Sequence, residues 1–347
     1  MAGSESDVVT RLEEAILSLI RWVAVSDVFG PDSCQWISGQ FSFRKARTVA
    51  RWVVMMKQII MLIQMKTHAT IRELFYSSIR TYSTQVVTNR ILAKVTQFLG
   101  VPRETLHVFS PSKTLVRGPF LLTEISYSAD VEVDCNNVFE TRGHQLSSFG
   151  VSRITCYAKP NFILVVEKET AFQHLLAANF IHCLYPCVIM TARGFPDLAS
   201  RKLIHLMNCH LNGRTRLFCL CDYDPHGLAI AMTFAFGGEQ NKQKYYTEDC
   251  AIPQMEPLLL PEPKEAVSKG IIREEDTKSM TPLDLHLLQT LHNRLKHLEQ
   301  QFPSQLHASW RKSLESMLHN RVKYELDAFS DLPEVVGSII SVTVSLP

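Results

Sequence analysis

Hydrophobic residues recur with helical spacing along the first hundred positions of the chain. An apolar stripe near the start consists of Val8, Leu12, Ile16, Leu19 and Val23. Residues 44–65 and 85–99 show the same periodicity, which is typical of helices with one buried face. Gly100 follows the second of these and suits a left-handed C-cap. We expect a helical N-terminal region, whose first stripe packs either against its own domain or against a partner protein.

A further helix is predicted to begin at Ile71. Thr70, followed three residues later by Glu73, fits a capping box, in which each side chain accepts a hydrogen bond from the other residue's backbone N–H. The apolar face of this helix is expected to contain Ile71, Leu74, Phe75, Ile79 and Tyr82. Phe75 and Tyr82 are therefore assigned to the core.

The neighbouring face of that helix is more polar. It carries Arg72, Tyr76 and Arg80 at intervals of four residues, and residues four apart are neighbours on a helix surface. We expect Tyr76 to lie at the surface, with an arginine one turn away on each side.

Short strand-like runs follow the helices. They lie at residues 106–109, 114–116 and 120–125, and Gly118-Pro119 marks a turn between the last two. Three helices followed by a small β-ribbon form the winged-helix pattern. In that arrangement the helix beginning near Gln85 would be the recognition helix of a helix-turn-helix.

The pattern changes near residue 150, where apolar runs begin to alternate with helical segments. Strands are predicted at 162–166, 187–191 and 217–221, and a helix at 198–210. This βαβ alternation is typical of an α/β domain with a central parallel sheet. The proline-rich stretch from Ile252 to Pro263 is interpreted as a surface connection.

Acidic residues stand at the ends of two of these strands. Glu167 follows the first, and the third runs into Asp222-Tyr-Asp224-Pro-His-Gly227. The carboxyl ends of parallel strands meet at one edge of a sheet, so Glu167, Asp222 and Asp224 should converge. Each acid alone has an ordinary explanation as a solvated loop residue or a cap. The combination favours a hard divalent cation with oxygen ligands, Mg²⁺ or Mn²⁺.

Composition and length narrow the class of protein. The chain has 347 residues, of which 46% are hydrophobic and 20% charged, as in an ordinary globular protein of two domains. We place a helical extension at residues 1–40, a winged-helix domain at 41–150 and a metal-binding α/β domain at 151–347. The net charge of +2 neither favours nor excludes nucleic acid.

Targeting signals, membrane spans and cysteine spacing do not point to a particular function. No secretory signal is visible at the N-terminus, and the most apolar stretch, residues 52–65, is interrupted by polar residues and too short to span a bilayer. The nine cysteines include no CxxC pair, which indicates a reducing compartment. A local concentration of basic side chains is either a solvated helix face or a binding surface. It consists of Arg44, Lys45, Arg47 and Arg51.

Several segments resemble a known family. Glu167 and Asp222-x-Asp224 on a βαβ unit look like a Toprim domain. Ile163-Leu-Val-Val-Glu-Lys168, Gly194-Phe-Pro-Asp197 and the residues from Asp222 to Gly227 closely resemble the topoisomerase VI A-subunit family. Within that family, His226 is typical of the branch that makes meiotic double-strand breaks.

The N-terminal half shows the same resemblance independently. Residues 70–76 are similar to the family segment that carries the nucleophilic tyrosine, with an arginine four residues before it. Residues 110–118 resemble the wing segment, in which Lys113 is expected to approach DNA. Trp310, Met317 and residues 323–328 also match the spacing of a family helix, so the resemblance covers roughly residues 44 to 329.

The chain departs from the family pattern in three places. Phe75 stands where members of the meiotic branch usually have a second tyrosine, and its predicted core position makes that change harmless. The proline-rich stretch after Cys250 and the tail beyond Phe329 also differ from the usual pattern.

The resemblance implies a DNA-cleaving transesterase. Tyr76 would attack a phosphodiester and form a 5′-phosphotyrosyl link, Arg72 would supply positive charge, and Lys113 and Arg80 would contact double-stranded DNA. Mg²⁺ or Mn²⁺ held by the three acids would assist.

The resemblance also implies partners and a location. The active form would be a homodimer that works in the nucleus with an ATPase-like B subunit, docked through residues 8–23. This chain contains no P-loop, so any use of ATP belongs to the partner. Two other functions stay open: an ATP-dependent topoisomerase that reseals its breaks, and a non-catalytic DNA-binding homologue.

Overall fold

A computed structural model describes residues 5–25, 43–101, 103–109, 112–126, 129–137, 142–237, 250–303 and 306–344. The chain divides into two compact units, Met1–Pro111 and Ser112–Pro347. This division falls earlier than the border expected at residue 150, because two strands before that residue join the main sheet of the second unit. The assignment of three regions by role stays a prediction.

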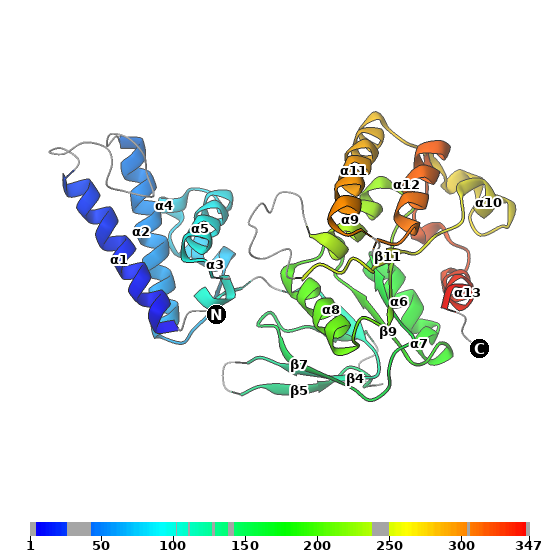
Figure 1. Cartoon of the computed structure of the whole chain (residues 1–347), viewed down its shortest axis with the longest axis horizontal. Helices are drawn as coiled ribbons and strands as arrows, with labels where there is room; N and C mark the ends of the chain where they lie inside the picture. Colours follow the sequence, from blue (N-terminus) through cyan, green and yellow to red (C-terminus); the bar gives the residue numbers. More distant parts are fainter. Residues whose placement is uncertain are drawn as a thin grey trace. The chain divides into compact units, whose positions relative to one another are not determined.

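The first unit is built on two long helices, α1 (Glu5–Val25) and α2 (Phe43–Gln64), which lie side by side (Figure 1). Val8, Leu12 and Leu19 of the apolar stripe are completely buried in the core of this unit. Val23, the last member, is exposed. The stripe therefore packs within its own unit, which was one of the two alternatives.

Three shorter helices pack on this pair: α3 (Ile71–Ser77), α4 (Ile79–Tyr82) and α5 (Gln85–Leu99). The capping box of Thr70 and Glu73 is present, and Gly100 ends α5 in the left-handed conformation with φ of 63°. Both predictions from the sequence are confirmed. Tyr82 is completely buried, as expected.

The helix predicted from Ile71 to Tyr82 is interrupted, and this part of the prediction is wrong. Ser78 has φ −146° and ψ 45°, and its N–H bonds Phe75 O three residues back. Serine hydroxyls compete for local hydrogen bonds and weaken helix interiors; here Gln58 Nε2 donates to Ser77 Oγ at 2.6 Å. Because of the interruption Ile79 leaves the apolar face and is 47% exposed.

The expected β-ribbon is also different. β2 (Val108–Phe109) pairs with β1 (Ala69–Thr70) in the first unit, whereas β3 (Leu115–Arg117) and β4 (Phe120–Glu124) join two different sheets of the second. The helices of the first unit remain consistent with a winged-helix domain. Ser110 and Pro111 of the expected wing segment lie outside the described residues.

The second unit contains a six-stranded sheet in the order β11-β10-β8-β9-β3-β6. The strands β8 (Phe162–Val166), β9 (Cys187–Thr191) and β10 (Arg216–Leu220) are parallel, as is β11 (Glu256–Pro257), whereas β3 and β6 (His144–Gln145) are antiparallel. Every residue of β8 and β9 is buried, as their unbroken apolar runs predict. The α/β fold with a central sheet containing parallel strands is confirmed. The remaining strands, β5 (Val131–Asp134) and β7 (Val151–Cys156), flank β4 in a second sheet.

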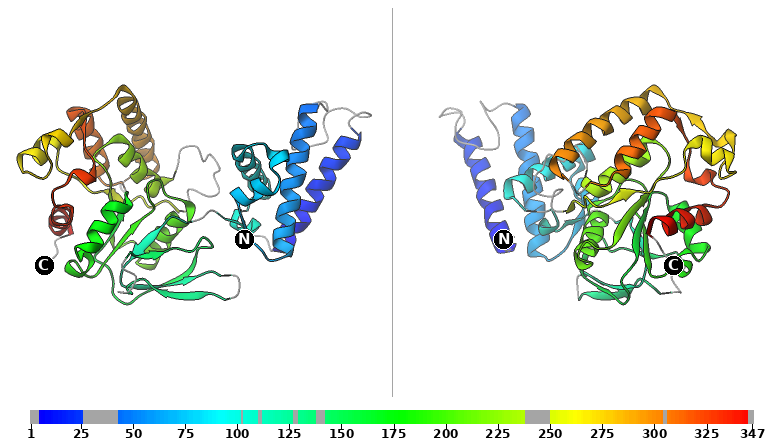
Figure 2. Two further views of the ribbon diagram at one scale, coloured as in Figure 1. Left: turned by 180° about the vertical axis from the view of Figure 1, so that it is seen from behind. Right: turned by 45° about the vertical axis from the view of Figure 1, so that its right-hand side comes forward.

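Helices surround the main sheet (Figures 1 and 2). α8 packs along β7, α11 lies beside both α9 and α12, and α13 packs on α6. Their bounds are α6 (Glu169–Ala177), α7 (Phe180–Cys183), α8 (Leu198–His210), α9 (Pro225–Phe236), α10 (Pro263–Ser268), α11 (Pro282–Gln301), α12 (Ser309–Asn320) and α13 (Leu332–Val344). Shorter elements are η1 (Arg103–Leu106), η3 (Glu274–Asp276), β12 (Lys278–Ser279), β13 (Val322–Lys323) and η4 (Leu326–Ala328).

The stretch from Ile252 to Pro263 is not a surface connection. Ile252 and Met255 are completely buried, and the stretch contains β11, which pairs with β10. Its prolines suit an edge strand, which needs fewer N–H donors than a central one.

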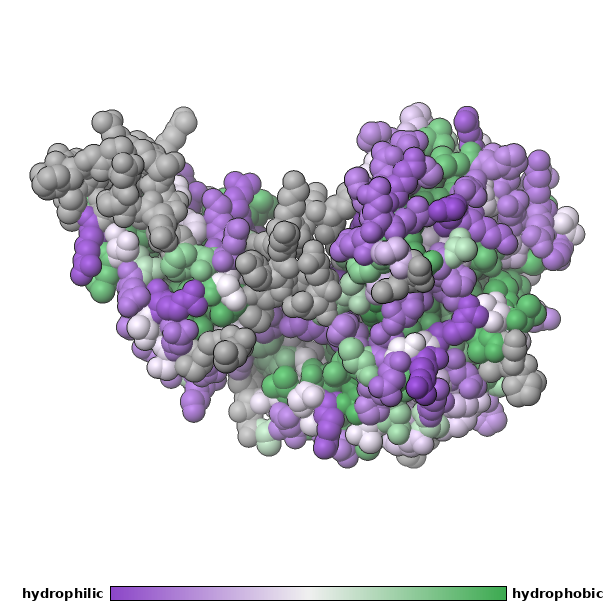
Figure 3. Space-filling view, viewed as in Figure 1, coloured by the Kyte–Doolittle hydropathy of each residue, from purple (hydrophilic) through white to green (hydrophobic). Residues whose placement is uncertain are grey.

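Hydrophilic side chains cover α11 on the face shown in Figure 3. Among the described residues, no helix combines the length and apolar character needed to cross a membrane.

The two faces of α1 give a matched stability test. We expect Leu12→Ala to lower the free energy of unfolding by about 2–5 kcal/mol, because it leaves a cavity against α2. Leu17→Ala on the same helix, where the leucine is 51% exposed, should change it by less than about 0.5 kcal/mol. Urea denaturation followed by circular dichroism measures both. Equal effects of the two substitutions would contradict the packing described here.

Candidate functional site: an exposed tyrosine and a buried acidic centre

Tyr76, the nucleophile predicted from the resemblance, lies at the surface of the first unit. It lies on α3, and 55% of the residue is exposed. Arg72, one turn earlier, places its guanidinium carbon 5.8 Å from the centroid of the Tyr76 ring. Phe75 is partly buried against the core of this unit, so it faces inward as predicted, although it is not fully enclosed.

Tyr82 has the opposite surroundings. It is completely buried, and its hydroxyl donates to Gln58 Oε1 at 2.6 Å. Burial raises the pKa of the Tyr82 phenol well above its ordinary value. A phenol that is both inaccessible and harder to ionise is a poor nucleophile, which leaves Tyr76 as the candidate of the two.

The predicted neighbour Arg80 is placed differently. It is exposed on α4, and the interruption at Ser78 removes it from the regular position one turn after Tyr76. Two other arginines hold the turn between α4 and α5: Arg51 Nε donates to Thr81 O at 2.9 Å, and Arg47 bonds Ser83 Oγ at 2.7 Å. Arg47 and Arg51 of the basic cluster thus stabilise this turn. The side chains of Arg44 and Lys45 lie outside the described residues.

The acidic centre of the second unit forms at the carboxyl ends of β8 and β10. These strands are parallel neighbours with Val166 opposite Leu220. Glu167 is the first residue after β8 and Asp222 the second after β10, so both lie at the same edge of the sheet. The N–H of Asp222 donates to Glu167 Oε2 at 2.9 Å. Both acids are buried. The convergence of these two residues follows directly from the strand register.

Asp224 begins the helix that follows β10. It is the N-cap of α9, and its Oδ1 accepts the N–H of Gly227 at 2.6 Å. A side chain at position 227 would place its Cβ 2.6 Å from Asp222 O and 3.0 Å from Glu167 Oε2. Only glycine therefore allows the helix to begin this close to the two buried acids.

Asp222 is fixed by a distant part of the chain as well. Its Oδ1 accepts the N–H of Leu326 at 2.9 Å, and the backbones of Tyr223 and Tyr324 form a β-bridge whose N–H groups bond the opposite carbonyl at 3.0 and 3.3 Å. The two tyrosine rings are stacked, with centroids 4.9 Å apart. The segment after β13 is thus part of the acidic centre.

Burial and mutual repulsion set the charge of the acids. The pKa of Glu167 is raised to about 7, mainly by burial and then by the charges of Asp222 and Asp224, against the lowering effect of the Asp222 N–H bond. Burial also raises the pKa of Asp222, opposed by the Leu326 N–H and by Lys168. At this site burial and repulsion between the acids outweigh the positive charge that is available.

Lys168 supplies one cation at this centre. Its Nζ lies 3.0 Å from Asp222 Oδ2, 2.9 Å from Glu325 Oε2 and 3.0 Å from Asp327 Oδ2. Burial lowers the pKa of Lys168, but its bonds to these carboxylates outweigh that effect and raise it. Reasoning from the sequence assigned no role to Lys168, Glu325 or Asp327. The signal that could have found them was the pair of acids in Glu325-Leu-Asp327, together with a lysine that directly follows Glu167.

The ligand atoms that this centre offers are carboxylate oxygens, the type that a hard divalent cation prefers. Glu167, Asp222 and Asp224 each bond a backbone N–H through one oxygen, which orients the carboxylates. Among the described residues, no three acidic, histidine or cysteine side chains are spaced to enclose an ion by themselves. Small hard ions keep several waters and need only one or two carboxylates, so the oxygen-only set remains suitable.

The other predicted contact residue, Lys113, is exposed in the second unit. Its backbone N–H donates to Asp197 Oδ2, the N-cap carboxylate of α8, at 3.0 Å. A DNA contact by Lys113 stays a prediction.

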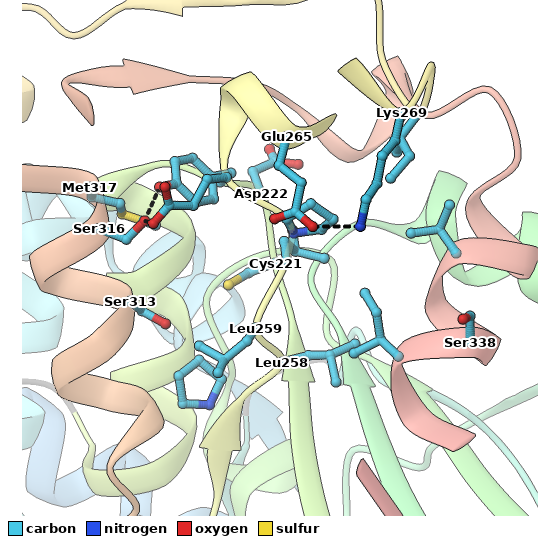
Figure 4. A pocket seen from close by; sticks show the side chains of 18 of the residues that line it. Cys221, Asp222, Leu258, Leu259, Glu265, Lys269, Ser313, Ser316, Met317 and Ser338 are labelled. Atoms are coloured by element: carbon cyan, nitrogen blue, oxygen red, sulfur yellow. Dashed lines mark hydrogen bonds and ion pairs between the residues drawn. The ribbon is translucent and has the colours of Figure 1, made fainter. Parts of the chain in front are cut away.

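A cavity of about 670 Å³ borders Asp222 on the side of α10, α12 and α13 (Figure 4). There Glu265 and Lys269 form an ion pair at 2.6 Å.

Two family models match the chain. One, for the Toprim domain of Spo11 and the A subunit of topoisomerase 6, matches residues 162–335, and the other, described as type IIB DNA topoisomerase, matches residues 47–108. The first range contains the whole acidic centre, and the second contains Tyr76 and Arg72. Toprim domains generally bind divalent metal ions, which agrees with the oxygen-only donors found here.

Individual proteins show the same similarity. The chain is 28% identical to meiotic recombination protein SPO11 of Mus musculus over 94% of this chain and 84% of that protein. It is 28% identical to the Homo sapiens protein of the same name over 80% of this chain, and 26% identical to the A subunit of DNA topoisomerase 6 from Arabidopsis thaliana over 83%. These last two matches span 65% and 62% of the length of the two relatives.

The raised pKa of Glu167 predicts how stability depends on pH. A carboxyl group with a higher pKa in the folded chain binds more protons when folded, so the free energy of unfolding falls as pH rises from 4.5 to about 7. The loss is at most about 3 kcal/mol. We expect Glu167→Gln to remove most of it when unfolding is measured in a chelator at pH 5 and pH 8.

A matched control is Glu132→Gln on β5, where the carboxylate is exposed and only 3.9 Å from Arg153. It should keep the pH dependence of the unaltered protein. A Glu167→Gln protein with the same pH dependence as the control would contradict the charge assignment at the acidic centre.

Proposed function

Since the chain belongs to the family of Spo11 and the topoisomerase 6 A-subunit, we propose that it is a DNA transesterase that makes double-strand breaks and so initiates meiotic recombination. The reaction class follows the family, and the meiotic role follows the relatives named meiotic recombination protein. Such a role implies action in the nucleus.

One observation supports this proposal above the others. Tyr76 is exposed with Arg72 beside its ring, within the range matched by the type IIB topoisomerase model. A DNA-binding homologue without catalysis has no need for an exposed tyrosine beside an arginine, or for a buried acidic centre with an excess of negative charge. The retention of both features therefore favours catalysis over DNA binding alone.

The chemistry assigned to Tyr76 is an in-line displacement. Its hydroxyl oxygen attacks phosphorus, the bond from phosphorus to the 3′-oxygen breaks, and the phosphate stays on the 5′ end as a phosphotyrosyl ester. The phenol proton leaves to solvent or a base, and the departing 3′-oxygen takes up a proton to become a free hydroxyl. Arg72 favours this step, because a nearby guanidinium stabilises both an ionising phenol and a phosphate.

Glu167, Asp222 and Asp224 are proposed to hold Mg²⁺, for which Mn²⁺ can substitute because both prefer oxygen ligands. When bound, the ion would stabilise negative charge on the phosphate and on the departing oxygen. The protein's own contribution is to orient the carboxylates by backbone N–H bonds and to keep them partly dehydrated. Lys113 and Arg80, both exposed, are proposed contacts for the phosphates of double-stranded DNA.

A double-strand break needs two nucleophiles, and each chain supplies one Tyr76. We therefore propose that the active form is a homodimer, in which the tyrosine of one copy works with the acidic centre of the other. The family also implies an ATPase-like B subunit. Docking through residues 8–23 would use the outer face of α1, with Leu17 and Ile20, because the inner face is buried.

A second candidate function is that of a topoisomerase. A relative named as an A subunit of DNA topoisomerase 6, from Oryza sativa subsp. indica, matches with a similar identity of 28%. Such a protein would reseal its breaks by the reverse of the step above. Together with a B subunit it would relax supercoiled DNA, whereas a break-forming protein would remain covalently attached to 5′ ends.

The nucleophile is tested by recovering protein that is covalently joined to DNA. We expect Tyr76→Phe to abolish the adduct completely, because the attacking oxygen is gone, while DNA binding is retained. Tyr82→Phe is the matched control. It removes one hydrogen bond, costs about 1 kcal/mol of stability and should leave the adduct in place. An adduct that persists in Tyr76→Phe would reassign the nucleophile.

A further inference from the structure

The side chain of Lys168 is held in a site built from two distant parts of the chain. Its ammonium lies 2.9–3.0 Å from carboxylate oxygens of Asp222, Glu325 and Asp327. Thr170 Oγ1 donates to the second oxygen of Asp327 at 3.1 Å, which fixes that carboxylate. The ammonium is thus oriented by three carboxylates, of which Asp327 is held by Thr170 and Asp222 by the N–H of Leu326.

The ammonium lies at the oxygen of Asp222 to which a second metal ion would bind. Asp222 has two oxygens, and Oδ1 already accepts the N–H of Leu326. Lys168 bonds the other oxygen, Oδ2. In sites with two metal ions, a carboxylate commonly bridges the pair, and the ions lie about 3.5–4 Å apart. At Asp222 the second position is occupied by a cation that belongs to the protein.

We propose that Lys168 takes the place of a second divalent cation at the acidic centre, so that each chain binds a single ion. This inference rests on the proposed function, since it assumes that Glu167, Asp222 and Asp224 form a metal site. Lys168 is then a positioning residue: it neutralises Asp222 Oδ2 and excludes another cation by like-charge repulsion. Glu325 and Asp327 serve the site by holding the ammonium.

A purely structural explanation is that Lys168 only ties the segment from Glu325 to Asp327 to the sheet. The backbone already makes that connection through the Tyr223–Tyr324 bridge and the Leu326 N–H. The two explanations differ in what replaces the lysine. If the ammonium only ties segments together, its removal weakens the fold. If the ammonium replaces a second metal ion, its removal opens a position for a divalent ion among Asp222, Glu325 and Asp327.

The number of bound ions distinguishes these explanations. We would titrate the purified full-length chain with Mn²⁺ and follow bound ion by electron paramagnetic resonance, which also reports whether two ions are close enough for their spins to couple. The unaltered protein should bind one uncoupled Mn²⁺ per chain. Lys168→Gln should bind two coupled ions, and Lys168→Arg, which keeps a cation, should return to one.

Lys278→Gln is the matched control, because Lys278 pairs with the same Glu325 at 3.6 Å from the exposed strand β12. It should bind one ion. A folded Lys168→Gln protein that still binds one ion would overturn the inference and leave the proposed function intact. Two ions in the unaltered protein would overturn the inference even if Lys168→Gln failed to fold. No bound ion in the unaltered protein would overturn the proposed metal site itself, and the inference with it.

Discussion

The hydrogen bond from the Asp222 N–H to Glu167 is the constraint on which the second unit depends. It requires β8 and β10 to be adjacent, parallel and in register at their ends. Burying two carboxylates so close together is unfavourable unless positive charge or N–H donors compensate. The surroundings supply these: the Leu326 N–H, the Lys168 ammonium and, in the proposed function, a metal ion. Much of the architecture around the sheet edge can be understood as support for this charged pair.

In the proposed function the first unit meets a different requirement, since its nucleophile must be accessible. Tyr76 and Tyr82 lie six residues apart, and the interruption at Ser78 between them separates their environments. One ring is exposed beside Arg72, while the other is enclosed and bonded to Gln58. Phe75 contributes contacts to the core without offering a second hydroxyl. The local sequence therefore leaves one phenol of this helical segment available for chemistry.

The sequence predicted the parts of this molecule that are governed by local pattern. The buried strands, the capping box at Thr70, the cap at Gly100 and the positions of the acids at strand ends all follow from short-range rules. The pairing of β3 with β9 and the burial of Ile252 and Met255 depend on contacts across long stretches of chain, and local pattern contains no information on them. The serine hydroxyls at the interruption likewise accept hydrogen bonds from Gln58, which lies on another helix.

The candidate site shows the same division. Glu167, Asp222 and Asp224 could be named from the sequence because parallel strands bring their ends together. The contacts of Lys168 with Glu325 and Asp327 could not be predicted in this way. These two acids lie more than 150 residues away and are brought to the lysine by the bridge between Tyr223 and Tyr324 and by the bond from the Leu326 N–H to Asp222. Gly227 is informative only when the position of Asp222 O is known, since its requirement comes from a close approach and not from its conformation.

The bridge between Tyr223 and Tyr324 has a consequence for shortened forms of the chain. A product that ended before residue 324 would keep all three acids at the strand ends and would still look complete to a motif search. It would nevertheless lack the N–H that orients Asp222, the stacked ring beside Tyr223 and both acids that hold Lys168. The integrity of this centre is therefore decided by residues that follow the recognisable motif by a hundred positions.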